Sequence, residues 1–179
     1  MNKIFLPAIA FSSVLLATGS LSTVAQAKTR MGDSIISTTP IYLTQSTSLS
    51  IAALEQKTLV QINQYRAGRG LPPLTSNATI RQQARLHSQN MANGTVPFGH
   101  QGFQQRLQAI ARVIPLMAMA ENVAYNSGYS DPVTTAVQGW LKSPGHKVNI
   151  EGNYNLTGIG VAKSRTGAYY FTQIFLRRR

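Results

Sequence analysis

The apolar residues between positions 52 and 142 recur every three or four places in several segments, the spacing that gathers side chains on one face of a helix. In the first segment Leu54, Thr58 and Ile62 follow this period, and the pattern stops at the glycine- and proline-rich residues 68–73. Four helices are predicted in this way. Their expected positions are Ala52 to Gln64, Ser76 or Asn77 to Asn93-Gly94, Phe103 to Val113, and Asp131-Pro132 to about Lys142.

The C-terminal part of the chain has a different pattern, rich in β-branched and aromatic residues. Runs at 156–164 and 168–176 are separated by Arg165-Thr166-Gly167, which predicts two strands joined as a β-hairpin. A further strand is expected over residues 119–125. Because the helices come first along the chain and the hairpin comes last, the order of elements indicates an α+β fold.

The N-terminal residues predict export. Lys3, the apolar run from Ile4 to Ala17 and the small residues of Ala25-Gln26-Ala27 form the pattern of a secretory signal peptide, residues 1–27. The alternative is a membrane anchor, but polar residues and a proline interrupt the run, so we expect no membrane span after signal removal. Residues 28–50 are Ser/Thr-rich and typical of a linker, and residues 51–179 are expected to form one domain.

The composition narrows the setting in which the protein works. The chain has no cysteine, which excludes disulfides and thiol nucleophiles and favours a bacterial secreted, periplasmic or cell-envelope protein. The chain has 17 Lys and Arg and only five Asp and Glu. The resulting formal net charge of +12 favours anionic envelope polymers as partners. Nucleic acid is not expected, because no basic stripe is interleaved with stacking aromatics. A basic surface without any specific partner is the open alternative.

Three residues that are far apart in the sequence are candidates for one functional site. His146 follows a Ser-Pro-Gly turn, His100 ends the segment Pro-Phe-Gly-His, and Glu121 lies in Ala-Glu-Asn-Val-Ala-Tyr. Two imidazoles and a carboxylate suit metal binding or proton transfer. Any such role requires the fold to bring all three into one cleft that solvent can reach.

Several short motifs occur in a fixed order over about residues 52–176. They are Asn63-Gln-Tyr-Arg66, Gly70-Leu-Pro-Pro-Leu74, Ala84-Arg-Leu-His-Ser88, Met91, Gly99-His100, Ala120-Glu-Asn122, Gly139-Trp140, Ser143-Pro-Gly-His146, Asn149-Ile150, Gly158-Ile-Gly-Val161 and Tyr170-Phe-Thr-Gln-Ile-Phe175. With these motifs the chain resembles the CAP (SCP-like) domain in its bacterial form, related to cysteine-rich secretory proteins, antigen 5 and pathogenesis-related proteins. The resemblance implies a three-layer α-β-α sandwich with a central antiparallel sheet.

The resemblance also implies which residues line the groove of the family. Its two histidines correspond to His100 and His146, and its first glutamate corresponds to Glu121. In some relatives these histidines hold a divalent metal such as zinc. The second glutamate, which in animal members follows the tryptophan of the helix, has no counterpart after Trp140, so the set of four is reduced to three.

A metal at His100 and His146 is one of two interpretations of this set. Two imidazoles and one carboxylate match the ligands of a zinc site with an open position, although only modest affinity is expected. The compact pair His-Glu-x-x-His is absent from the sequence. The other interpretation is that Glu121 accepts a hydrogen bond from an imidazole and fixes its tautomer.

Other motif residues have structural as well as functional interpretations. Gln173 is expected either to point its amide into the groove or to make a hydrogen bond on the sheet face. Trp140 is predicted to anchor its helix, and Asn122 and Asn149 are predicted to hold loop backbone. His87 lies on the inner stripe of the second helix, where a core histidine bonded to backbone is favoured over a role in the groove.

The sequence favours binding over catalysis. Chemistry by paired carboxylates needs two acids at one site, and Glu121 is the only acid of the domain that lies in a motif. We therefore expect an exported, non-catalytic or weakly catalytic module that binds a small molecule, lipid, peptide or polysaccharide in its groove. The alternative is a metal-assisted hydrolase of envelope polymers or peptides with Glu121 as general base. A third interpretation is an interaction module whose groove is vestigial.

Overall fold

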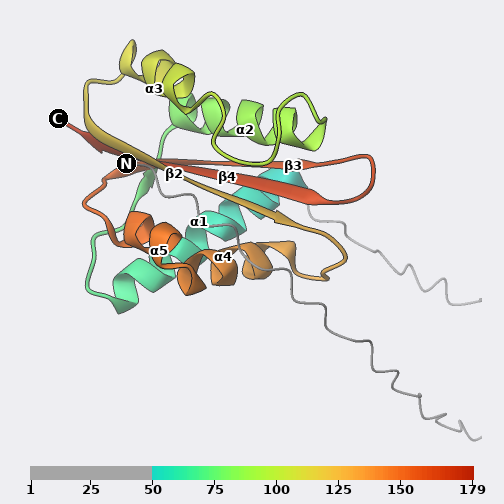
Figure 1. Ribbon diagram of the computed structural model, residues 1–179. Helices are drawn as coiled ribbons and strands as arrows, with labels where there is room; N and C mark the ends of the chain where they lie inside the picture. Colours follow the sequence, from blue (N-terminus) through green and yellow to red (C-terminus); the bar gives the residue numbers. More distant parts are fainter. Residues whose placement is uncertain (1–49) are drawn as a thin grey trace, which may run out of the picture. The chain divides into compact units, whose positions relative to one another are not determined.

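The folded part of the chain has three layers. The computed structural model describes residues 50–179, so the predicted signal peptide and nearly all of the predicted linker lie outside the described residues. Figure 1 shows α2 and α3 on one face of a four-stranded sheet and α1, α4 and α5 on the other, the predicted α-β-α sandwich. The elements are α1 (Ile51–Gly68), β1 (Thr75–Ser76), α2 (Ala78–Ala92), α3 (Phe103–Ala111), β2 (Leu116–Asn126), α4 (Pro132–Lys142), α5 (Pro144–Glu151), β3 (Leu156–Lys163) and β4 (Tyr169–Arg178).

The strand order is β1-β3-β4-β2, with β2 at one side of the sheet. The β3–β4 pair is the predicted hairpin, and β2 pairs antiparallel with β4. The sheet is nevertheless mixed and not wholly antiparallel, because β1 runs parallel to β3, with Thr75 opposite Leu156. Two residues are too few to show an alternating pattern, which is why the sequence did not predict β1. In the span from 50 to 179, no helix is long and apolar enough to cross a membrane.

Three helices, α1, α2 and α4, begin at a residue whose side chain caps the helix. Asn77 accepts a hydrogen bond from the backbone of Ile80 at 3.2 Å and so begins α2, and Ser50 caps α1 in the same way. The fifth helix, α5, was not predicted, since its Ser-Pro-Gly start was interpreted as a turn. Pro144 instead occupies the first helical position, where its missing N–H costs nothing. This places His146 in the first turn of a helix.

The two faces of the sheet bury separate apolar clusters. Trp140 and Phe175 belong to the cluster under α1, α4 and α5, whereas Ile80 and Ile174 belong to the cluster under α2 and α3. On the second face α2 lies directly against β3. A Cβ atom built on Gly160 would be 2.2 Å from the backbone carbon of Ala84, so only glycine permits this approach. Helix α2, which leads into the loop of His100, is thus held in close contact with the sheet.

A buried arginine fixes the segment that follows α5. The Arg66 side chain, on α1, is 1% exposed and its guanidinium donates to the backbone oxygens of Pro72, Ile150 and Gly152 at 2.9, 2.6 and 3.1 Å. The Ile150 residue is fully buried, and leaving its carbonyl oxygen without this donor would be costly. Arg66 therefore sets the position of the C-terminal end of α5 relative to α1.

The cap of α4 gives the first testable prediction. Asp131 accepts hydrogen bonds from Lys57 and from the hydroxyl and backbone N–H of Thr134 at 2.8, 2.7 and 3.1 Å. Burial alone would raise the pKa of Asp131, but these bonds outweigh it and lower the pKa from 3.8 to about 2. Because the folded pKa lies below the unfolded one, the stabilisation is present above pH 4 and is lost as the pH falls towards 2.

We expect Asp131→Ala to lower the free energy of unfolding by about 1 kcal/mol at pH 7, measured by urea denaturation. At pH 2.5 the variant and the wild type should differ much less. Asp131→Asn is the control, because asparagine keeps a capping side chain and removes only the titrating charge. An equal deficit of Asp131→Ala at both pH values would contradict the assigned cause.

Candidate functional site

The centre of the site is a buried carboxylate with partners on both oxygens. Glu121 lies on β2, and its side chain is 1% exposed. Arg106, on α3, donates to Glu121 Oε2 from Nε at 2.7 Å and to Oε1 from Nη2 at 2.6 Å. The Nδ1 atom of His100 lies 3.0 Å from Oε1. The sequence-predicted pair His100 and Glu121 is thus in direct contact, with Arg106 as a third member.

The loop that carries His100 is held from both helices beside it. His87, on α2, places Nε2 at 2.7 Å from the backbone oxygen of Gly99, which can only accept. Arg106 Nη1 donates to the backbone oxygen of Gln101 at 2.9 Å. His87 is 3% exposed, so it is the core histidine bonded to backbone that the sequence favoured. Its Nε2 also lies 4.0 Å from Glu121 Oε1, directly behind the carboxylate.

The surroundings keep Glu121 ionised. Burial raises the pKa of Glu121, but hydrogen bonds from His100 and Arg106 and the charge of Arg106 together bring it below the ordinary value of 4.5. Burial also lowers the pKa of His87, with a smaller contribution from the charge of Arg106. The buried pair at neutral pH is therefore carboxylate and guanidinium beside a neutral imidazole. A general base works best with a pKa near the operating pH, and Glu121 is shifted away from it.

The second half of the site lies on the opposite face of β2. Asn122 is fully buried and donates from Nδ2 to the backbone oxygen of His146 at 3.0 Å, while Asn149 donates to Asn122 Oδ1 at 2.9 Å. These bonds tie α5 to β2. Trp140 is 1% exposed and donates from Nε1 to the backbone oxygen of Val123 at 2.9 Å, so it anchors α4 to the same strand.

The two imidazoles sit close enough for their charges to interact. Burial lowers the pKa of His146, and the nearby His100 lowers it further. The His100 side chain is 51% exposed, whereas the Nδ1 atom of His146 is buried and has no hydrogen-bond partner among the described residues. His100 thus lies beside Glu121 on the α2–α3 side of β2, and the backbone of His146 is bonded to Asn122 on the α5 side. We refer to His100, Glu121 and His146 as the edge site.

Gln173 is not part of the edge site. It is fully buried, and its Nε2 lies 3.3 Å from the Thr157 hydroxyl. Nε2 thus makes the sheet-face hydrogen bond that the sequence left open, whereas Oε1 of Gln173 is buried with no hydrogen-bond partner in the part of the chain that the structure describes. Helices α1, α4 and α5 cover this face of the sheet, which a pattern of alternating residues does not reveal.

The donor atoms of the edge site do not fit a resident zinc ion as arranged. Within residues 50–179, no three His, Asp or Glu side chains are grouped so as to hold a metal. A catalytic zinc site has three protein ligands, but both oxygens of Glu121 already accept hydrogen bonds from Arg106. Only the two imidazoles are left as donors, beside a guanidinium that would repel a cation.

Arg106 is the functional residue that the sequence interpretation missed. It lies four positions before Ile110 on the inner face of α3 and is 7% exposed. A basic residue on the apolar face of a short helix is a signal that a buried acid lies opposite.

Beside Arg106, between α2 and α3, is a cavity of about 520 Å³. Its lining consists of Gln83, Leu86, His87, Asn90, Val96, Gln101, Gly102, Gln105, Arg106 and Ala109.

Comparison with known proteins gives a match over most of the folded part. The family model described as "CAP: Cysteine-rich secretory protein family" matches residues 59–175. A curated relative, the uncharacterized protein YkwD of Bacillus subtilis, is 32% identical over 136 residues, which is 74% of this chain and 51% of the relative. The chain thus spans about half the length of that relative.

Two solved structures show the same arrangement of elements. An outer surface protein of Borrelia burgdorferi has a TM-score of 0.63 at 18% identity and covers 73% of this chain and 97% of its own. An extracellular protein of Bacillus anthracis that contains an SCP domain has a TM-score of 0.57 at 27% identity, covering 74% of this chain and 45% of its own.

Proposed function

The chain belongs to the cysteine-rich secretory protein (CAP) family, and from this premise we propose that it is an exported, non-catalytic module that binds a cell-envelope ligand at the edge site. Export is supported by the predicted signal peptide at residues 1–27 and by the extracellular protein of Bacillus anthracis among its relatives. The basic composition, with a net charge of +12, suits an anionic envelope.

The observation that carries the proposal is the bidentate pair between Arg106 and Glu121. Such a pair fixes the carboxylate and compensates its charge, so Glu121 orients His100 instead of accepting protons from a substrate. What remains available to a ligand is the exposed ring of His100 and the half-buried ring of His146. These two imidazoles offer hydrogen bonds to the polar groups of a ligand.

A binding experiment on the edge site tests this proposal. Labelled soluble peptidoglycan fragments are mixed with the full chain, and retention is compared with that of His100→Ala and His146→Ala. We expect each variant to bind at least about tenfold more weakly, equivalent to the loss of about 1.4 kcal/mol of binding free energy. Val148→Ala is the matched control, because Val148 is 63% exposed on the same helix as His146.

The same fragments test the hydrolase alternative. Incubation with the wild type in the presence of zinc is expected to yield no cleavage product at any pH between 5 and 8. Product that forms with the wild type and disappears with Glu121→Gln would overturn the non-catalytic proposal. Fragments that bind equally well to both histidine variants would overturn the edge site as the binding surface.

A further inference from the structure

Three aromatic rings lie together on the surface at one end of the sheet. Phe98, Tyr125 and Tyr170, which we call the aromatic platform, have centroid separations of 6.3, 6.5 and 5.0 Å for the pairs Phe98–Tyr125, Phe98–Tyr170 and Tyr125–Tyr170. Phe98 and Tyr125 are 52% and 51% exposed. The rings therefore contact one another and still leave about half of two of them in water.

Packing within the fold explains only part of this cluster. Tyr125 and Tyr170 are opposite each other in the β2–β4 pair, where aromatic pairs stabilise a sheet. Phe98, in contrast, comes from the loop between α2 and α3 and adds an exposed ring to a pair that already exists. Grouped exposed apolar surface is unfavourable in water and marks binding surfaces.

The platform lies on the same face of the sheet as Glu121 and His100, the half of the edge site on the side of α2 and α3. Tyr125 lies four residues after Glu121 on β2, so both side chains point to the side of α2 and α3, about 13 Å apart along the strand. Phe98 is two residues before His100 on the same loop. A ligand that extends along β2 would contact both places, whereas a single small molecule would reach only one.

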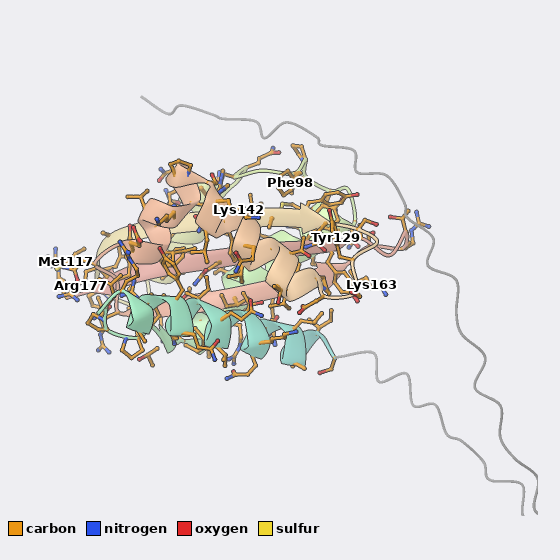
Figure 2. All side chains as sticks on the ribbon, turned by 90° about the horizontal axis from the view of Figure 1, so that it is seen from below. Phe98, Met117, Tyr129, Lys142, Lys163 and Arg177 are labelled. Carbon is orange, nitrogen blue, oxygen red and sulfur yellow. The ribbon has the colours of Figure 1, made fainter. Side chains whose placement is uncertain are left out.

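The charges of the folded part as a whole favour an anionic ligand. Each side-chain carboxylate in residues 50–179 is paired with a basic residue: Glu55 with Arg85, Glu121 with Arg106, Asp131 with Lys57, and Glu151 with Arg69 and Lys147. Lys163 lies 5.2 Å from the centroid of Tyr169, which precedes Tyr170 in β4 and so points to the opposite face, so Lys163 is at the same end of the sheet but not on the platform. Figure 2 shows Phe98, Tyr129 and Lys163 towards one end of the molecule, with Met117 and Arg177 towards the other.

We infer that the aromatic platform binds sugar rings of an acidic polysaccharide whose chain continues to the edge site. This inference rests on the proposed function and names the class of its ligand. Aromatic rings have a negative face, which attracts the C–H groups on the flat face of a pyranose. Acidic groups of the polymer complement the basic surface. An acyl chain would instead need an enclosed apolar channel, which an open surface of three rings does not provide.

The test uses the full chain and oligosaccharides of defined charge. Hyaluronan and oligogalacturonate decasaccharides are the acidic probes, chitohexaose is the neutral probe, and binding is measured by calorimetry at low salt. The wild type should bind at least one acidic probe more tightly than chitohexaose. Phe98→Ala and Tyr125→Ala should each weaken that binding about tenfold. Tyr125→Phe, which keeps the ring, and Tyr129→Ala, whose ring is 60% exposed but outside the platform, should stay within about twofold.

The possible results distinguish binding at the aromatic platform from binding at the edge site. If Phe98→Ala and Tyr125→Ala bind the acidic probes as well as the wild type does, charge alone accounts for binding and the platform is overturned. Phosphatidylglycerol vesicles serve as an additional, lipid probe. If the wild type binds none of the oligosaccharides, or binds only these vesicles, the proposal of a polysaccharide ligand is contradicted. In each case, loss of peptidoglycan-fragment binding in His100→Ala and His146→Ala would leave the edge-site proposal standing, because it is measured with a different probe and different residues.

Discussion

Replacing Arg106 by methionine is expected to lower the free energy of unfolding by about 3–5 kcal/mol at pH 7. The substitution leaves the Glu121 carboxylate buried without its cationic partner, and it also frees the Gln101 carbonyl in the loop of His100. Removal of one member of a buried ion pair costs far more than the pair contributes, because the remaining charge is uncompensated. Urea denaturation of the variant and the wild type measures this difference.

The sign of the pH dependence should also reverse. In the wild type the pKa of Glu121 is lowered, so its contribution to stability is present above pH 4.5 and is lost as the pH falls. Without Arg106, burial becomes dominant and raises the pKa, so the deficit of the variant should grow as the pH rises from 4 to 7. The double variant Arg106→Met with Glu121→Gln should recover much of the loss. A deficit below about 1 kcal/mol, or one independent of pH, would contradict the assigned pairing.

Gly160→Ala is expected to reduce the free energy of unfolding by about 3 kcal/mol, the upper part of the range for an overfilled interior. The added methyl would lie 2.2 Å from the backbone carbon of Ala84 and 2.3 Å from the backbone nitrogen of Arg85. Backbone atoms cannot rotate away as a flexible side chain would, so α2 must shift from β3. Thermal or urea denaturation measures the loss.

Gly139→Ala is the matched control for this substitution. Gly139 lies within α4, and a Cβ atom built there meets nothing within 4 Å. Because alanine favours the helix over glycine, this variant should gain about 0.5–1 kcal/mol. Equal effects of the two glycine substitutions would show that helix propensity, and not the contact between α2 and β3, decides the result.

Local signals predicted the elements well because the interactions that form them are local. The cap at Asn77 and the turn between β3 and β4 each depend on only a few neighbouring residues. Helix α5 was missed because Ser-Pro-Gly suits both a turn and the first turn of a helix, and only Arg66 and Asn122 on other elements decide between them. Strand β1 was missed because it exists only through its pairing with β3.

The site was predicted to a different extent. The family resemblance identified His100 and Glu121, which are in contact, and His146, which lies near them. It did not reveal Arg106, because a buried ion pair depends on which face of α3 meets β2. The alternation along the last strand likewise left two places open for Gln173, because its burial is set by helices from other parts of the chain. The residues of the edge site were thus easier to predict from the sequence than Arg106 and Gln173, whose positions depend on packing between the layers.

The hydrogen bond from the Trp140 indole to the Val123 carbonyl has a consequence for association between chains. Strand β2 ends the sheet on one side, and a strand in that place presents backbone groups to which a strand of another molecule can add. The indole occupies the Val123 carbonyl of this strand, so that acceptor is not free to pair with a strand of another molecule. A tryptophan that belongs to the core therefore also reduces the number of acceptors on this strand with which another chain can pair.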